Sequence, residues 1–387
     1  MKSAERFTEA RECVIVLLTQ PLNSCDYACG PRLRDAQLYL SCIETHALRM
    51  NLAIRPADLE RDRKAMLALL VEHFADWAEW KDERKFDWLY VENPMGTPRT
   101  WLLECGDEIV GLSSAFRRRL RVEGRTSEAW VLGDFCVAKE HRSLGPAMAL
   151  QRATCERVDR GDVDLWYDFP SRTMTAIYGR MGVNPGGEMV RLVYPLRVDR
   201  MLEKQMPNGF VATGLREVGN KVLASRDAVR RRDASIEVSL RDRDFEADVE
   251  SGIEAKGGIS LERSAAYLNW RYRTDPRGPA SILAARRGGR EEGVLVFRYG
   301  ERDVHIWDAF AIADTAVFRE LVLEVIEIAR SRDAVSVTAV LSDRHAWMGP
   351  LEKLGFHRRD SAPFFVYAGR GVLKPNTSWI LMSGDRD

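Results

Sequence analysis

Residues 133–147 read Gly133-Asp134-Phe135-Cys136-Val137-Ala138-Lys139-Glu140-His141-Arg142-Ser143-Leu144-Gly145-Pro146-Ala147. This is the pattern of a strand that passes through a loop into a helix. The first turn of a helix carries unpaired N–H groups and a partial positive charge, so it binds phosphate. Gly145 lets the backbone approach an anion closely, and Ala147 is small for the same reason. Pro146 suits the first turn but removes one N–H donor.

The flanking sequence predicts a mixed sheet. Apolar runs separated by turn residues indicate two hairpins before this segment, with turns at Cys105–Glu108 and Glu123-Gly124. A short strand and an Asp-capped helix precede the hairpins, from Asn51 onward. The segments predicted to follow are a helix at Ala147–Val158, a strand at Val163–Asp168, a helix at Ser171–Met181 and a strand at Met189–Leu196. The order is β-α-β-β-β-α-β-α-β, which is a mixed α/β fold.

Part of the sequence then repeats at a constant offset. The run Phe86–Gly96 matches Leu268–Gly278 at Trp, Tyr, Pro and Gly. The same offset carries the turn glycines of one hairpin, Gly106 and Gly111, onto Gly288 and Gly293. Because rare residues and turn glycines coincide, we interpret the chain as two copies of one fold.

Two motifs resemble the GNAT N-acyltransferase superfamily. Arg142-x-x-Gly145-x-Ala147 is similar to its R/Q-x-x-G-x-G/A pyrophosphate loop, and Tyr178–Val183 looks like its Y-x-x-x-G-F segment. The resemblance covers residues 50–198 well and 235–370 weakly. It implies two tandem GNAT-like acyl-CoA acyltransferase domains, each an α+β mixed sheet that splays between its fourth and fifth strands.

The resemblance also implies the site. Acetyl-CoA, or another acyl-CoA, is the expected co-substrate, and its pantetheine arm pairs with the fourth strand, Trp130–Val137. A backbone N–H of that strand then polarises the thioester carbonyl. The residues expected to bind the cofactor are Phe135, Cys136, Val137, Arg142, Ser143, Leu144, Gly145 and Ala147.

Direct attack by an acceptor amine needs a base and an acid. An ammonium has no lone pair, so a base must take a proton, and Asp134 is the first candidate for it. Tyr178, whose phenol keeps its proton at neutral pH, is the candidate acid for the leaving thiolate. Glu140, Asp168 and His141 are weaker candidates for the base. Two further residues are weaker candidates for the site. Cys136 has no His or Asn placed in the sequence to activate it as a nucleophile, and Ser171 stands where the family often has an Asn that contacts CoA.

The expected division of the chain is an N-terminal extension at 1–49, a catalytic domain at 50–198, a linker at 199–234 and a degenerate domain at 235–387. The extension holds four of the seven cysteines and shows no sustained period, and Met50 is the hypothesised natural start. In the second copy Leu351 replaces Tyr178. The counterpart of the phosphate loop there, Ala311–Val317, has no glycine, and Asp314 would repel phosphate.

Bulk composition excludes some classes. Lys+Arg and Asp+Glu are both 58, so the chain is not built mainly to bind nucleic acid or an anionic membrane. No apolar stretch approaches the ~20 residues of a membrane helix. The seven cysteines include no CxxC pair, so no metal is expected, and reduced thiols favour the cytoplasm. The expected partner is a small amine, and homodimerisation stays open.

Two other functions share this fold. One is a FemX-like transferase that uses aminoacyl-tRNA, against which the Arg142–Ala147 loop and the neutral charge weigh. The other is a non-enzymatic regulator that binds acyl-CoA without turnover. Nothing in the sequence identifies the acceptor or the length of the acyl chain.

Overall fold

The computed structural model describes residues 52–74, 83–122, 124–198, 217–221, 223, 232–247, 249, 252, 258–374 and 377–386. The expectations for residues 1–49, and most of those for 199–234, lie outside these ranges. Residues Asn51–Asp387 form one compact unit. Below, the first half means residues 52–198 and the second half means residues 232–386.

The first half has the predicted order of elements. Asp58 accepts hydrogen bonds from the N–H groups of Glu60 and Arg61 and so begins the first long helix. The β2–β3 turn is made by Gly106 at φ +63°, in the left-handed region that favours glycine. The elements are β1 Leu52–Pro56, α3 Leu59–His73, α4 Glu83–Phe86, a π-helical turn Asp87–Val91, β2 Arg99–Cys105, β3 Glu108–Val122, β4 Arg125–Val137, α5 Leu144–Asp159, β5 Leu165–Asp168, α6 Arg172–Met181 and β6 Pro185–Pro195.

The second half repeats most of this order, with two additional strands, β8 and β14. Its elements are β7 Ile236–Leu240, β8 Gly258–Leu261, α9 Ala265–Arg273, β9 Ser281–Arg287, β10 Arg290–Tyr299, β11 Asp303–Phe310, α10 Thr315–Ser331, β12 Ser336–Ser342, α11 Met348–Lys353, β13 His357–Ala368 and β14 Ser378–Ile380. The ends of α6 and α11 match in detail. Gly182 (φ +72°) and Gly355 (φ +95°) follow the two helices. The next N–H groups bond back to the carbonyls of Tyr178 (3.0 Å) and Leu351 (3.1 Å). The alignment of Tyr178 with Leu351 is therefore confirmed.

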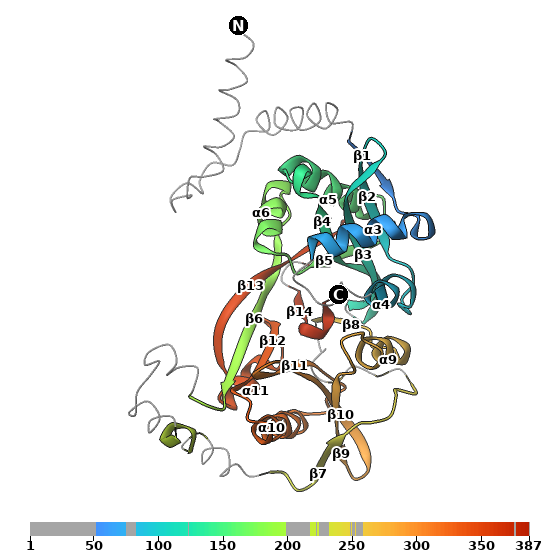
Figure 1. The fold of residues 1–387 in the computed structure, drawn as a ribbon. Coiled ribbons are helices and arrows are strands. Elements are labelled where there is room, and N and C mark those ends of the chain that lie inside the picture. Colours follow the sequence, from blue (N-terminus) through green and yellow to red (C-terminus); the bar gives the residue numbers. More distant parts are fainter. Residues whose placement is uncertain are drawn as a thin grey trace, which may run out of the picture. The chain divides into compact units, whose positions relative to one another are not determined.

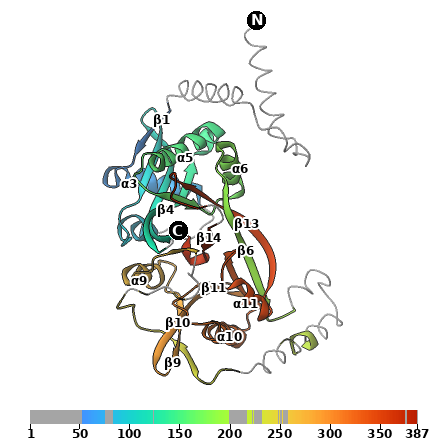
Figure 2. The same ribbon diagram turned by 180° about the vertical axis from the view of Figure 1, so that it is seen from behind.

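The two halves exchange strands β6 and β13. The main sheet runs β1-β2-β3-β4-β5-β13-β6-β12-β11-β10-β9-β7. β13 of the second half thus lies beside β5 of the first, and β6 of the first lies beside β12 of the second. β6 and β13 also pair with each other in antiparallel register, for example Met189↔Ala362. Figures 1 and 2 show the two strands side by side from both directions.

The hydrophobic cores follow the exchange. β6 places Val190, Leu192 and Tyr194 in the core that the second half builds around α10. β13 places Phe364 in the core of the first half, where it joins Leu112, Phe116 and Tyr167. Each half therefore completes the core of the other. None of the helices within the described ranges is long and apolar enough to cross a lipid bilayer.

The repeated tryptophans meet each other. The Trp88 and Trp270 rings stack with centroids 4.5 Å apart and planes 19° from parallel. Trp88 Nε1 donates to the carbonyl of Trp270 at 3.1 Å, and Trp270 Nε1 donates to that of Trp88 at 2.9 Å. This reciprocal contact is what a two-fold relation between the halves requires. Both rings are buried, so the pair also satisfies two polar groups that would be costly to leave unpaired.

The exchange makes the first half dependent on the second. We expect the fragment 50–198 to show no cooperative thermal transition by circular dichroism and to aggregate on size-exclusion chromatography. Without β13 the outer edge of β5 is unpaired, and the apolar face of β6 has no core.

The control is co-expression with a 232–387 fragment, which should restore a soluble complex of both pieces. A monomeric 50–198 fragment with a sharp melting transition would contradict the structural role given to β13.

Candidate active site

The sheet opens between β4 and β5. The two strands pair in parallel only at three positions, and the last of these is Val131↔Tyr167. β4 continues beyond that point to Val137, still paired with β3. The predicted splay between the fourth and fifth strands is therefore present. It leaves the β5-facing edge of residues 132–137 beyond the ladder with β5, where an extended ligand could add hydrogen bonds.

A β-bulge lies in this free stretch of β4. The register with β3 shifts between Leu112↔Cys136 and Ser114↔Gly133, so Asp134 and Phe135 together stand opposite Ser113. Asp134 has φ +49°, which is uncommon for a residue other than glycine. A bulge redirects a side chain and takes one residue out of the ladder. It thus aims the Asp134 carboxylate and provides backbone groups that could face a carbonyl oxygen.

Helix α5 begins beside the end of β4. Ser143 is its N-cap residue but makes no side-chain hydrogen bond to the first turn, and no acidic residue lies in that turn. Leu144, Gly145 and Pro146 are the first three helical residues. The N–H groups at this end therefore keep their partial positive charge for an external anion. The helix begins three residues earlier than predicted, which puts Gly145 inside its first turn.

Arg142 connects β4 with α3. Its Nε donates to the carbonyl of Val137 at 3.0 Å, and its Nη2 lies 3.1 Å from Nδ1 of His73. Burial and the neighbouring guanidinium lower the pKa of His73, so His73 is neutral and accepts this bond. The side chain remains exposed at the start of α5. Arg142 therefore adds a fixed positive charge beside the helix end.

Tyr178 lies on α6, with its hydroxyl at the end of β5, and is fully buried. Its hydroxyl donates to Oδ2 of Asp168 at 2.5 Å, and its ring packs against Phe365 of β13, with centroids 5.0 Å apart. Burial, and then the Asp168 carboxylate, hold the pKa of Tyr178 well above its usual value. The structure thus brings two of the predicted candidates, Tyr178 and Asp168, into one hydrogen-bonded pair.

A second tyrosine–carboxylate pair escaped the sequence analysis. Tyr90, fully buried, donates to Oδ2 of Asp134 at 2.9 Å and lies 2.7 Å from Oγ of Ser114. Ser114 Oγ is in turn 3.0 Å from Oγ1 of Thr100. The signal that could have revealed Tyr90 was its place in the repeat, where it matches Tyr272.

The remaining candidates occupy other positions. Glu140 and His141 lie in a 3₁₀ turn, Lys139–His141, between β4 and α5. Cys136 is fully buried, and burial raises its thiol pKa far above the usual value, as expected for a core cysteine and not a nucleophile. Ser171 caps α6 by accepting from the N–H of Met174. Among the described residues no group of His, Cys, Asp and Glu could hold a metal ion.

The corresponding opening of the second half is filled. β11 and β12 pair in parallel only as far as Ile306↔Ala339. Beyond that point the C-terminal segment enters: Met382 bridges to Leu341, and the N–H of Ser342 donates to the carbonyl of Leu381 at 2.9 Å. On the other side, a Cβ added to Gly384 would lie 3.2 Å from the Trp307 carbonyl of β11. The chain therefore occupies the second opening itself.

At the N-terminus of α10, the helix after β11, a side chain already occupies the backbone N–H groups. Asp314 caps α10 by accepting from the N–H of Val317 at 2.9 Å, and it pairs with Arg287 at 2.9 Å. The predicted phosphate-loop counterpart thus holds a carboxylate where α5 has none. The two helix ends differ in charge although they stand at matching places in the fold.

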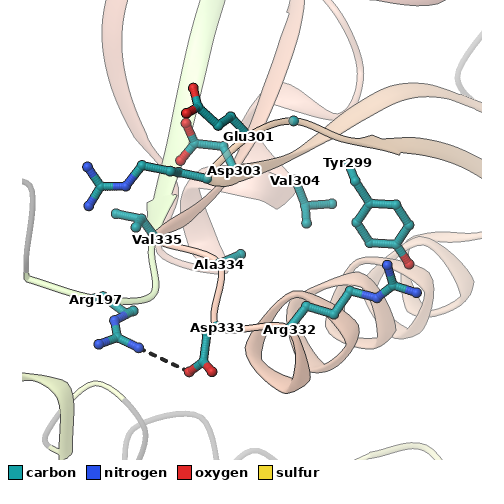
Figure 3. A pocket seen from close by; sticks show the side chains of 11 residues that line it. Arg197, Tyr299, Glu301, Asp303, Val304, Arg332, Asp333, Ala334 and Val335 are labelled. Atoms are coloured by element: carbon teal, nitrogen blue, oxygen red, sulfur yellow. Dashed lines mark hydrogen bonds and ion pairs between the residues drawn. The ribbon is translucent and has the colours of Figure 1, made fainter. Parts of the chain in front are cut away.

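A cavity of about 470 Å³ lies elsewhere, at the start of β11 and the α10–β12 turn (Figure 3). It is at the opposite end of these strands from the second opening. Arg197 pairs with Asp333 at 3.0 Å, and the Arg332 guanidinium stands 3.9 Å from the centre of the Tyr299 ring. The cavity is lined by the second half and Arg197, away from β4 and α5. It is therefore not part of the predicted acyl-CoA site.

Comparison with known proteins assigns the first half. Residues 53–186 match the family model for the acetyltransferase (GNAT) domain. This part of the chain is similar to a GNAT domain. The matched residues include the β4 bulge, the start of α5 and Tyr178 on α6, so the similarity supports, in general terms, acyl transfer from acyl-CoA. No curated protein matches the sequence.

Solved structures share the fold over both halves. A conserved protein of unknown function from Enterococcus faecalis aligns with a TM-score of 0.57 and 13% identity, over 81% of this chain and 72% of its own. A GCN5-related N-acetyltransferase from Anabaena variabilis aligns with 0.56 and 13%, over the same 81% and 72%. The N-myristoyltransferase of Saccharomyces cerevisiae, solved with myristoyl-CoA, aligns with 0.50 and 13%, over 84% and 82%. The GNAT-like fold thus extends beyond the region of the family match.

The two helix ends should respond differently to the loss of their cap residue. Asp314→Ala removes a cap bond and should lower the free energy of unfolding by about 1 kcal/mol. Ser143→Ala removes no cap bond and should change it by less than about 0.5 kcal/mol. Urea unfolding followed by tryptophan fluorescence measures both. An equal loss from both variants would mean that α5 is capped by its own serine and is not free for an anion.

Proposed function

We propose that the chain transfers an acyl group, acetyl in the first instance, from acyl-CoA to an amine at the β4–β5 opening. The observation that carries this is the open edge of β4 beside a helix start without a capping side chain or an acidic residue. The pantetheine arm would pair with β4 along residues 132–137, and the pyrophosphate would lie at the N–H groups of α5 near Arg142. Phe135, Cys136, Val137, Ser143, Leu144, Gly145 and Ala147 line these two stretches.

In this reaction each of the two tyrosine–carboxylate pairs, Tyr90–Asp134 and Tyr178–Asp168, has one task. The Asp134 carboxylate takes a proton from the acceptor ammonium, and the freed lone pair attacks the thioester carbonyl. A backbone N–H at the bulge stabilises the oxygen that becomes negative. The C–S bond then breaks, and the leaving thiolate takes the proton of Tyr178. The second proton of the nitrogen restores the Tyr178 phenol, and Asp134 releases the first proton to solvent. The products are an amide, free CoA and one proton released to solvent.

The second half is proposed to have lost this activity. Its opening holds residues of the C-terminal segment, its helix start holds Asp314, and Leu351 has no proton to donate. It instead supplies β13, which covers β5 and packs Phe365 on Tyr178. The domain boundaries, the oligomeric state and the cytoplasmic location stay predictions.

Calorimetric titration with acetyl-CoA tests the site. Wild type should bind one equivalent, and Gly145→Glu should lose binding because it places an anion in the first turn of α5. Ala316→Glu is the matched control, since Ala316 is likewise the second helical residue of α10. It should bind like the wild type.

If wild type and both variants fold but none binds acetyl-CoA, the α5 start is only a helix start. A transferase that uses aminoacyl-tRNA would then be the better hypothesis.

Tyr178→Phe separates an enzyme from a regulator. The variant should keep its affinity for acetyl-CoA and lose about 10²–10⁴ in kcat, the usual contribution of an acid catalyst. Release of CoA thiol with an amine acceptor measures the rate, and calorimetry measures the affinity. Unchanged turnover would remove Tyr178 from the chemistry. Acetyl-CoA binding without turnover in any variant would favour a binding protein.

A further inference from the structure

Arg142, on the loop before α5, is held by acceptors from two different elements. Its Nε donates to the Val137 carbonyl at the end of β4 at 3.0 Å, and its Nη2 donates to Nδ1 of His73 at 3.1 Å. A guanidinium has five N–H donors and no acceptor, so the His73 nitrogen is the acceptor and the ring proton lies on Nε2. The other N–H groups of this exposed side chain can serve a third acceptor.

His73 lies in the last turn of α3. The carbonyls at the C-terminal end of a helix carry a partial negative charge, which attracts the guanidinium. The Phe74 ring meets the His73 ring edge-on, with centroids 4.7 Å apart, and His73 is half-buried. These contacts fix the imidazole, so it can hold Arg142 in turn.

The repeated fold does not require an arginine at this place. Ser143 and Asp314 are the N-cap residues of α5 and α10. Arg142 precedes the first, whereas Ala313 precedes the second. In the second half the Asp314 carboxylate accepts from the N–H of Val317. The guanidinium thus accompanies the helix start that has no side-chain cap, which points to an anion as its third partner.

Two charged side chains act on the His73 ring: Arg142 from the loop and Glu72 from α3 itself. Burial, and then the charge of Arg142, lower the pKa of His73, while Glu72 opposes the shift. Cys136 of β4, a strand that α3 contacts, keeps its proton because burial raises its thiol pKa. His73 is therefore neutral at neutral pH, and its protonation would place two cations 3.1 Å apart.

We propose that His73 presets Arg142 for the pyrophosphate of acyl-CoA, and that it does so only while its ring is uncharged. This rests on the proposed acyl transfer and makes His73 a positioning residue, which acts through Arg142. A guanidinium that is already held in place loses less conformational entropy when the anion binds. A protonated ring cannot accept from Arg142, so the guanidinium is released as the pH falls, and the affinity for acyl-CoA falls with it.

Two acyl donors test the positioning role. His73→Ala should raise the Kd for acetyl-CoA about 3- to 10-fold, the usual effect of immobilising one long side chain on binding. S-acetylpantetheine has the same thioester but no pyrophosphate, so its kcat/KM, measured by thiol release, should stay within about twofold of wild type. His73→Asn places an amide oxygen near the position of Nδ1 and should keep the Kd for acetyl-CoA within about twofold of wild type.

Calorimetry with acetyl-CoA at about pH 7.5 and about pH 5 tests the charge requirement. Acidification should weaken binding by wild type at least about threefold more than binding by His73→Asn, which has no group to titrate at this place. The ligand phosphates titrate in both experiments and cancel in the comparison. His357→Ala is the matched control, because His357 is an exposed histidine on β13. It should follow wild type at both pH values.

Four results would overturn the inference. They are an unchanged Kd in His73→Ala, equal losses with acetyl-CoA and S-acetylpantetheine, no rescue by His73→Asn, or wild-type binding that does not weaken relative to His73→Asn on acidification. Thermal melting establishes that each variant is folded. A wild type that binds no acetyl-CoA at either pH removes the acyl-CoA site itself, and this inference with it.

Discussion

The antiparallel pairing of β6 with β13 is the constraint on which the rest of the structure depends. Each strand leaves its own half, pairs with the other at the centre of the sheet, and completes the partner's edge. The main sheet is therefore continuous, and each core contains side chains from both halves. The candidate site shares in this arrangement, since β13 is the outer neighbour of β5 and packs Phe365 on Tyr178.

In the repeated fold, the β4–β5 opening and the β11–β12 opening differ in what occupies them. The first has an edge of β4 beyond its ladder with β5, beside a helix start with no side-chain cap. The second holds Met382 against β12, and its C-terminal turn is tied to β11 through Arg263, which bridges Asp308 (2.8 Å) and Asp385 (3.2 Å). Asp314 caps its helix. The two openings thus differ in their local contacts although they stand at matching places in the repeated strand order.

Much of the frame could be predicted from sequence because it rests on local signals. Turn glycines, the Asp58 cap and alternating apolar residues fixed the element order of the first half. The repeat was visible because Trp88, Tyr90 and the following Pro and Gly recur at one offset. The strand exchange could not be predicted, because the apolar pattern of β6 suits a neighbour from either half. Patterning sets which face of a strand is buried and does not name its partner.

The candidate site was likewise predictable only in part. The loop motif located the start of α5 to within three residues, and Tyr178 was predicted as a site residue from its own segment. The contact between Tyr90 and Asp134 joins residues 44 positions apart and depends on the bulge, for which β4 carries no local signal. The occupant of the second opening comes from the far end of the chain. Such contacts are set by tertiary packing and only a structure reveals them.

Amide hydrogen exchange with and without acetyl-CoA most directly tests the difference between the open β4–β5 site and the filled β11–β12 opening. It reports protection of backbone N–H groups segment by segment. The account predicts that acetyl-CoA slows exchange in residues 132–137 of β4 and in the first turn of α5. Residues 307–310 of β11 and the first turn of α10 should exchange as before. Protection at the second opening, or at neither, would contradict it.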